Sequence, residues 1–165
     1  MNAEEFKRVY YPFHPKLYRI AFALLNNAED AKDILQDTYC KLWSKRNELP
    51  NVLQPELFCI RIIRNLCLDF IKAPKNRRDN EQIAFISTTT ETTPEQEMES
   101  KEKIRTIERI MQQLPEKQRI VIMMRVCSDC SLKEIETAMN ESAENVRVLL
   151  SRARKNIKNM LLNEQ

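Results

Sequence analysis

The basic residues near the end of this 165-residue chain are spaced for contact with a polyanion. Five Lys or Arg side chains and no acidic ones occur between Arg147 and Lys158. At 100° per residue, most of them lie opposite an apolar stripe formed by Val146, Leu150, Ala153 and Ile157. A DNA-recognition helix has this arrangement, because its apolar stripe packs on its own domain while its outer face reaches base edges. The candidate DNA-contacting residues are Ser142, Glu144, Asn145, Arg147, Val148, Ser151, Arg152 and Lys155.

Two of these residues suit particular base contacts. Arg147 is suited to a bidentate hydrogen bond with guanine O6 and N7, and Val148 to contact with a thymine methyl group. The alternative is a solvated C-terminal helix whose basic end is favoured by the helix dipole.

A second polar set lies on a helix predicted over residues 56–72. Arg61, Asn65 and Lys72 share one side of this helix, and Arg64 flanks them. The opposite side is apolar and comprises Cys59, Ile62, Ile63, Leu66 and Phe70. Asn and Arg in the middle of a helix suit contacts with phosphates and exposed bases. An amphipathic helix with a polar outer face accounts for the same pattern.

A third set is acidic and cannot bind DNA. Asp33, Gln36 and Asp37 share the outer face of a helix predicted to follow an N-cap at Asn27, with Glu29 in the first turn. This face either docks on a basic protein surface or is simply hydrated.

These three helices belong to a chain that has no glycine. Glycine supplies the positive φ angles of tight hairpins and phosphate-binding loops, so its absence argues against a β-rich fold and excludes glycine-loop nucleotide motifs. Long helical periodicities instead predict an all-α fold. The first of them, over residues 3–25, is expected to be interrupted by Pro12 and Pro15.

The C-terminal part of the chain has a helix-turn-helix pattern. Ser131 and Glu134 form a capping-box signature at the start of a short helix. A turn of Asn140, Glu141 and Ser142 then precedes the basic helix.

The charge distribution predicts two domains. Residues 1–78 hold 14 Lys or Arg and 9 acids, residues 79–100 hold 6 acids and no Lys or Arg, and residues 101–165 hold 13 Lys or Arg and 9 acids. Two basic blocks of this kind indicate acidic partners, although solvated helix faces are an alternative. We expect helical domains at residues 1–75 and 101–165, with an acidic, Ser/Thr-rich flexible linker at residues 76–100.

The remaining composition argues against an enzyme. A single histidine and no glycine leave no plausible catalytic triad or metal cluster, and we expect no cofactor and no bound metal. Cys127 and Cys130 have zinc-ligand spacing, but two further ligands are missing, so their metal or redox role stays open. The odd number of cysteines predicts reduced thiols, and the lack of an apolar leader or membrane span predicts a cytoplasmic protein.

The three polar sets, in this order and spacing, resemble the extracytoplasmic-function (ECF) sigma factors of the bacterial sigma-70 family. The segment LYRIAFALLNNAEDAKDILQDTYCKLW resembles regions 2.1 and 2.2, and LFCIRIIRNLCLDFIK resembles region 2.4. The segment LPEKQRIVIMMRVCSDCSLKEIETAMNESAENVRVLLSRARKNI resembles region 4. The resemblance covers about residues 6–72 and 101–162.

This resemblance implies a transcription initiation factor without chemistry of its own. Region 2.2, here Asp33, Gln36 and Asp37, would bind the β′ clamp helices of core RNA polymerase. Region 2.4 and the preceding loop, residues 47–55, would hold the melted non-template strand of the minus-ten element. The residues matched to that role are Phe58, Arg61, Arg64, Asn65 and Lys72.

The resemblance also implies that region 4 reads the duplex minus-thirty-five element in the major groove and meets the β flap. An anti-sigma factor is an expected further partner. The rival interpretation is a helix-turn-helix regulator without sigma activity, which would not need the acidic face.

The sequence departs from the family pattern in several places. Phe58 stands where a tryptophan is common, and the loop before it is less aromatic than in the family. The turn has Asn140-Glu141-Ser142 in place of a Gly-Ile-Ser type sequence, and Val148 and Leu149 replace polar residues on the recognition helix. Because Asn tolerates the left-handed conformation, we expect the turn to form with Asn140 in it.

Overall fold

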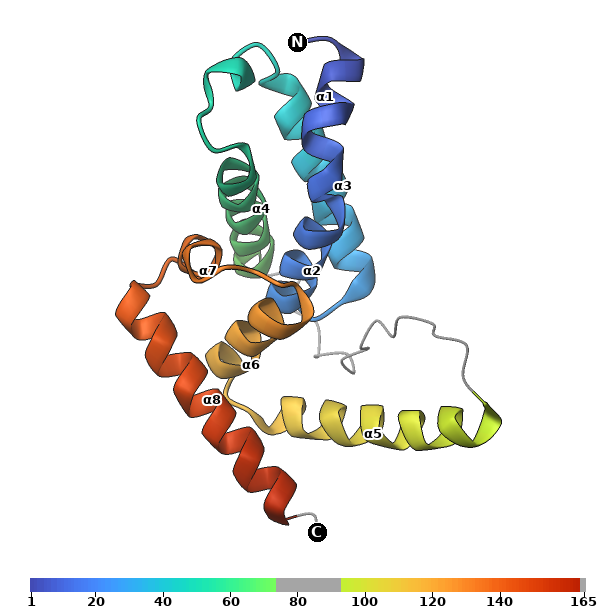
Figure 1. Ribbon diagram of the computed structural model, residues 1–165. Coiled ribbons are helices and arrows are strands. Elements are labelled where there is room, and N and C mark those ends of the chain that lie inside the picture. The colour runs from blue at the N-terminus through green and yellow to red at the C-terminus, as the bar shows by residue number, and fades with distance from the viewer. Residues whose placement is uncertain (74–92, 164–165) are drawn as a thin grey trace.

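A computed structural model describes residues 1–73 and 93–163, and within these ranges every regular element is a helix. The N-terminal group comprises α1 (Ala3–Tyr10), the 3-10 turn η1 (Tyr11–Phe13), α2 (His14–Leu25), α3 (Ala28–Ser44), the 3-10 turn η2 (Leu49–Asn51) and α4 (Pro55–Lys72). The C-terminal group comprises α5 (Pro94–Gln113), α6 (Glu116–Ile122), the π-helical turn η4 (Met123–Cys127), α7 (Leu132–Met139) and α8 (Ala143–Asn163). The predicted all-α fold is confirmed (Figure 1).

Proline and asparagine residues set the ends of the N-terminal helices. Helix α1 ends at Tyr10, immediately before η1, which contains Pro12. It ends there because proline lacks an N–H and its ring clashes with the preceding helical turn. Helix α2 ends at Leu25 and is capped by Asn26, whose φ of 52° is left-handed. The side chain of Asn27 then caps α3 by accepting a hydrogen bond from the N–H of Asp30 at 2.9 Å. The predicted cap and the predicted interruption at Pro12 are confirmed, whereas Pro15 lies in the first turn of α2 and does not interrupt it.

The predicted linker extends too far toward the C-terminus. Helix α5 begins at Pro94, inside the segment 76–100, because Thr93 and Gln96 form a capping box and proline fits the first helical position. The side chains of residues 93–103 are all exposed, so this start depends on the cap and not on burial. Residues 76–92 of the predicted linker lie outside the described residues.

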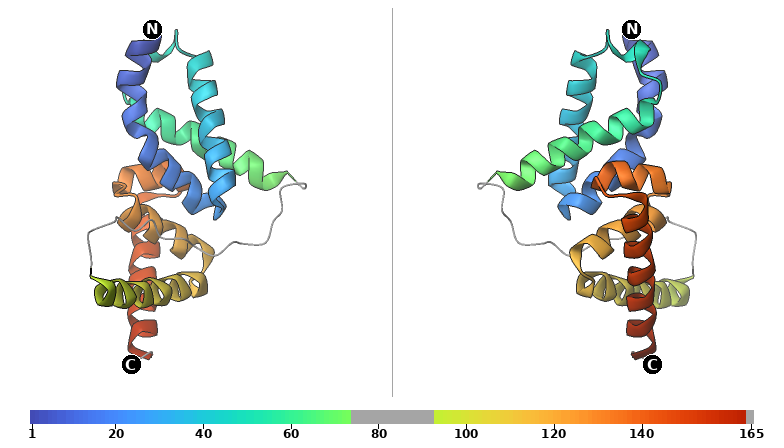
Figure 2. Two further views of the ribbon diagram at one scale, coloured as in Figure 1. Left: turned by 90° about the vertical axis from the view of Figure 1, so that its right-hand side faces the viewer. Right: turned by 90° about the vertical axis from the view of Figure 1, so that its left-hand side faces the viewer.

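Each group has its own packing. In the N-terminal group α2, α3 and α4 pack against one another, and Phe6 of α1 stacks edge-on against Trp43 of α3 at 5.2 Å between ring centroids. In the C-terminal group α6 and α7 pack on α8, and α5 crosses α8 (Figure 2). The polar sets on α3, α4 and α8 are thus carried by helices whose opposite faces are packed.

The two groups are also in direct contact with each other. Helix α7 lies against α4, while α6 and η4 lie against α2 (Figure 1). Buried apolar side chains from both groups form one contiguous cluster. The charge pattern predicted two domains joined by a linker and gave no indication of this contact.

Candidate nucleic-acid interface

The turn between α7 and α8 has the predicted helix-turn-helix geometry. Ser131 and Glu134 cap α7 reciprocally, with hydrogen bonds of 3.0 and 3.1 Å. Asn140 ends α7 with a φ of 52°, so the left-handed residue is the one predicted. Ser142 caps α8 by accepting a hydrogen bond from the N–H of Asn145 at 3.1 Å. These caps fix the direction in which α8 leaves the turn.

Helix α8 buries its apolar stripe and exposes its polar face. Val146, Leu150 and Ala153 are at most 4% exposed. The exposed members of the predicted set are Ser142, Glu144, Arg147, Val148, Ser151, Arg152 and Lys155. Val148 is 37% exposed. Its neighbour Leu149 is half-buried and packs against the core. These exposed residues therefore offer three cations and one apolar side chain, with the single acid Glu144 at the start of the helix.

Asn145 is placed differently from the rest of its set. It is half-buried, and its side-chain amide donates a hydrogen bond to Glu141, whose other oxygen pairs with Lys117 at 2.7 Å. The amide nitrogen of Asn145 is thus engaged in anchoring the turn. Farther along α8, the amide of Asn156 donates to Gln118 of α6 at 2.7 Å and fixes the other end of the helix.

Helix α4 exposes the second predicted set. Arg61, Asn65 and Lys72 are exposed, and half-buried Arg64 donates a hydrogen bond from Nη1 to Oδ1 of Asn65 at 3.1 Å. On the opposite side, Cys59, Ile60, Ile62, Ile63 and Cys67 are buried. Phe58 is half-buried and packs against the core, so the structure does not group its ring with the exposed polar side chains.

An exposed aromatic side chain next to the 47–55 loop was not predicted. Trp43 of α3 is 37% exposed, and the guanidinium of Arg46 lies 4.7 Å from its ring centroid. In the loop itself, Leu53 is 96% exposed. The sequence did carry a signal for the contact between Trp43 and Arg46, because residues three positions apart are neighbours on a helical turn.

Helix α3 presents the acidic set as predicted. Asp33, Gln36 and Asp37 are all exposed, and Glu29 is exposed beside them. Asp30, in contrast, is buried in the first turn of the helix.

A groove of about 710 Å³ borders this acidic face. Half of its lining residues are aromatic, namely Tyr11, His14, Tyr18 and Tyr39, and Gln36 also lines it. The rings of Tyr11, His14 and Tyr39 lie within 6.0 Å of one another between centroids. Burial raises the pKa of Tyr39 to about 12, so its hydroxyl stays protonated at neutral pH.

The structure brings the α4 set opposite the helix-turn-helix. Arg61, Arg64 and Asn65 line one wall of a cleft of about 390 Å³. The other wall is formed by α7 and comprises Lys133, Glu136, Thr137 and Asn140. The sequence offered no signal for this arrangement, because the two walls come from different predicted domains.

In the described part of the chain, Cys127 and Cys130 do not belong to any group of metal ligands. Among residues 1–73 and 93–163, no three His, Cys, Asp or Glu side chains are placed to share a metal ion. Cys127 is half-buried and Cys130 is fully buried, and burial raises the pKa of Cys130 to about 12. None of the helices in the described part of the chain is long and apolar enough to cross a membrane.

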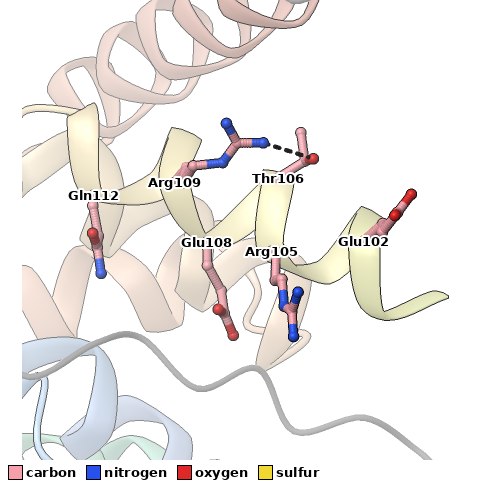
Figure 3. Close-up of a pocket in the computed structure, with 6 residues that line it drawn as sticks. All are labelled: Glu102, Arg105, Thr106, Glu108, Arg109 and Gln112. Carbon is pink, nitrogen blue, oxygen red and sulfur yellow. Dashed lines mark hydrogen bonds between the residues drawn. The ribbon is translucent and has the colours of Figure 1, made fainter. Parts of the chain in front are cut away.

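A further pocket runs along α5 and contains none of the predicted site residues (Figure 3). Its lining is polar and carries both signs of charge, and it comprises Glu102, Arg105, Thr106, Glu108, Arg109 and Gln112. Arg109 donates a hydrogen bond to Oγ1 of Thr106 at 3.1 Å within it. All six residues belong to the same helix.

Two family models match the chain. The model described as Sigma-70 region 2 matches residues 9–78, and the model described as Sigma-70, region 4 matches residues 104–157. The first match contains the polar sets of α3 and α4, and the second contains α6, α7 and most of α8.

Curated proteins and solved structures are similar to most of the chain. The RNA polymerase sigma factor SigV of Bacillus subtilis (strain 168) is 28% identical over 149 residues, which are 89% of this chain and 85% of SigV. The ECF RNA polymerase sigma factor SigW of the same organism is 25% identical over 160 residues, 90% of this chain and 84% of SigW.

Among solved structures, the sigma factor RpoE in complex with the anti-sigma factor NepR from Bartonella quintana superposes with a TM-score of 0.70 at 17% identity, over 99% of this chain and all of that one. CnrH in complex with the cytosolic domain of CnrY gives a TM-score of 0.63 at 17% identity, over 99% of this chain and 92% of that one.

Proposed function

Because the chain belongs to the sigma-70 family, as one of its extracytoplasmic-function sigma factors, we propose that it directs core RNA polymerase to a two-part promoter and helps to open the duplex there. The observation that carries the proposal is the exposed acidic face of α3 in a chain whose α4 and α8 expose basic faces. Basic faces serve DNA contact, but an acidic face repels phosphates and suits docking on a basic protein surface. A helix-turn-helix regulator without sigma activity would need only the face of α8.

In this proposal α8 reads the minus-thirty-five element as duplex in the major groove. Arg147 and Val148 lie in its first two turns, where a recognition helix contacts base edges. Arg152 and Lys155 lie farther along and hold the phosphate backbone. The turn that contains Asn140 sets the angle of α8, and Asn145 contributes mainly by anchoring that turn through Glu141.

Helix α4 and the 47–55 loop hold the melted non-template strand of the minus-ten element. Arg61, Arg64, Asn65 and Lys72 supply cations and an amide for the phosphates and base edges. Contacts with unstacked bases offset an unpairing cost of a few kcal/mol, and no nucleotide hydrolysis is needed. Phe58 is less available than the resemblance implies, because it packs on the core, whereas Trp43 and Leu53 are exposed near the loop.

We assign region 2 to residues 1–75 and region 4 to residues 101–165, with α5 extending the second domain back to Pro94. The face of Asp33, Gln36 and Asp37 docks on the β′ clamp helices, and region 4 meets the β flap. Two DNA sites in one chain raise affinity through effective concentration, so neither needs to bind tightly alone.

The factor has no chemistry of its own and works in the cytoplasm, where its polymerase partner is. Its regulator is an anti-sigma factor. This last assignment is supported by the fold shared with RpoE, which is bound to the anti-sigma factor NepR in its solved structure.

The test is reconstitution with bacterial core polymerase on a promoter library, with start sites as the readout. We expect the protein to select a promoter class, and absence of specific initiation would refute the proposal. The double variant Asp33→Arg/Asp37→Arg should lose polymerase binding. The matched control is Glu99→Arg/Glu102→Arg, which makes the same charge change on the exposed face of α5 and should bind normally. Full activity of the Asp33/Asp37 variant would favour the regulator interpretation.

A further inference from the structure

The cleft of about 390 Å³ between α4 and α7 is lined entirely by polar side chains. Arg61, Arg64 and Asn65 are three and four residues apart on α4, a spacing that places them on one side of the helix. The wall on α7 has the same helical spacing and comprises Lys133, Glu136, Thr137 and Asn140. Each wall is therefore one continuous face of a helix.

A lysine of α2 fixes the two walls relative to each other. The Nζ atom of Lys16 lies 2.9 Å from Oε1 of Glu56 on α4 and 2.9 Å from Oε2 of Glu134 on α7. The side chains of Lys16 and Glu134 are only 24% and 12% exposed, so solvent screens this pair less than an ordinary surface pair. Because Lys16 already neutralises these two carboxylates, they leave the cations of the cleft without a counter-charge.

The cleft holds more positive than negative charge. Arg61, Arg64 and Lys133 are its three cations, and Glu136 is its one acid. Within the described residues none of the three cations forms an ion pair, although Glu136 is three residues from Lys133. Arg64 donates a hydrogen bond to the amide oxygen of Asn65, which is neutral. The cations of the two walls repel one another across the cleft, and an anion bound between them would remove that repulsion.

The donors of the cleft suit a pair of phosphate groups. A guanidinium bonds two phosphate oxygens in parallel, and an ammonium binds phosphate as a compact charge. Lys133 is the second residue of α7, so the positive end of that helix dipole adds to its attraction for an anion. Three cations and one carboxylate leave an excess of two positive charges, which a diphosphate group neutralises.

Glu136 indicates that the ligand is more than a bare phosphate. A carboxylate only accepts hydrogen bonds and repels phosphate oxygens, so its partner must be a donor such as a ribose hydroxyl or the amino group of a base. Asn65 and Asn140 offer amides for further hydrogen bonds. The cleft volume of about 390 Å³ lies near the lower end of the range for small-ligand pockets, about 300–1,000 Å³. This size suits a single nucleotide better than a strand.

We propose that the cleft between α4 and α7 binds a nucleoside diphosphate, with its phosphates on Arg61, Arg64 and Lys133 and its sugar or base on Glu136. The two arginines also belong to the surface proposed for the minus-ten strand, so the nucleotide and the strand exclude each other. This consequence for promoter use rests on the proposed function, whereas nucleotide binding is a property of the free chain.

The test is a calorimetric titration of the full chain without polymerase, DNA or divalent cations. A salt concentration of about 0.15 M largely screens the attraction between distant exposed charges. The probes are ADP, GDP, CDP and UDP, with inorganic pyrophosphate and adenosine as the two halves of ADP. The variants are Lys133→Gln and Glu136→Gln, which change α7 and leave the minus-ten set intact. The matched control is Lys103→Gln, which makes the same change as Lys133→Gln at an exposed position of α5.

We expect at least one of the four diphosphates to bind more tightly than pyrophosphate, because only the nucleotide offers donors to Glu136. Lys133→Gln should weaken that binding about tenfold, as expected for the loss of one charge-assisted hydrogen bond. Glu136→Gln should bring the affinities of nucleotide and pyrophosphate closer together, because it removes the repulsion of bare phosphates. Lys103→Gln should match the wild type.

Absence of binding by all four diphosphates, or binding of pyrophosphate or adenosine as tight as the best of them, would overturn the proposal. Equal weakening in Lys133→Gln and Lys103→Gln would also overturn it, because it would assign the binding to general surface charge. Circular dichroism checks the folding of the variants, whose altered side chains are not buried. If the chain initiates transcription but binds no nucleotide, this site alone is refuted. If it binds nucleotide but never initiates, the proposed function fails and the site remains.

Discussion

At the scale of single residues, Val148 offers the most direct test of promoter recognition. It is the apolar side chain on the exposed face of α8 that lies between Arg147 and the cations farther along. Val148→Asp should reduce promoter-specific transcription at least about tenfold, because a carboxylate in the groove repels phosphates and loses the contact with a thymine methyl group. Since the side chain is 37% exposed, the melting temperature should change little. Run-off transcription and thermal circular dichroism measure the two effects.

The control for this variant is Leu162→Asp, which introduces the same charge at an exposed apolar position near the end of the same helix. It should transcribe normally. Equal activity of Val148→Asp and the wild type would exclude Val148 from the interface.

Single residues also show which structural features the sequence could predict and which it could not. The left-handed Asn140 was predictable, because the turn length and the intrinsic tolerance of Asn are local properties. The exposure of Trp43 was not predictable, because it depends on how Phe6 of α1 packs against the Trp43 ring. Likewise, periodicity placed Asn145 on the outer face of α8, but it could not show that the amide is bonded to Glu141.

At the scale of elements, α5 shows where composition misleads. Its first turns are rich in Glu and bury nothing, which predicts disorder, yet the Thr93 and Gln96 capping box begins the helix. Thr93→Ala should fray these turns, because loss of an N-cap costs about 0.5–2 kcal/mol. Amide hydrogen exchange should speed up at residues 97–100. The global melting temperature should stay constant, because the residues affected are exposed.

Lys101→Ala is the control for the cap, since it removes a charge from the exposed part of α5 without touching its start. Exchange at residues 97–100 should then be as slow as in the wild type. Fast exchange there in the wild type itself would show that the cap does not hold the first turns.

At the scale of the whole molecule, the contact between the domains lay beyond prediction. Lys16 and Glu134 are 118 residues apart, and each is an ordinary charged residue on an amphipathic helix. Hydrophobic periodicity identifies the apolar face of each helix, so the two domains and their polar sets were predictable. It does not identify the partner of a charged side chain, and two polar contacts between the domains, Lys16–Glu134 and Arg119–Ala23, are made by charged side chains.

Because Glu134 is a carboxylate whose Oε2 atom lies 2.9 Å from Nζ of Lys16 in the other domain, contact between the two domains should weaken in acid. The folded-state pKa of Glu134 is depressed below its usual 4.5, so its stabilising effect is complete above about pH 4.5 and is lost as pH falls through the folded pKa. The radius of gyration of the wild type should therefore rise on acidification from pH 6 into the range below 4.5, before helical circular dichroism is lost. In Glu134→Gln, which has no proton to gain at this position, the radius should already be large at pH 6 and change much less. A wild-type radius that stays constant until the helices themselves unfold would show that Glu134 does not hold the domains together.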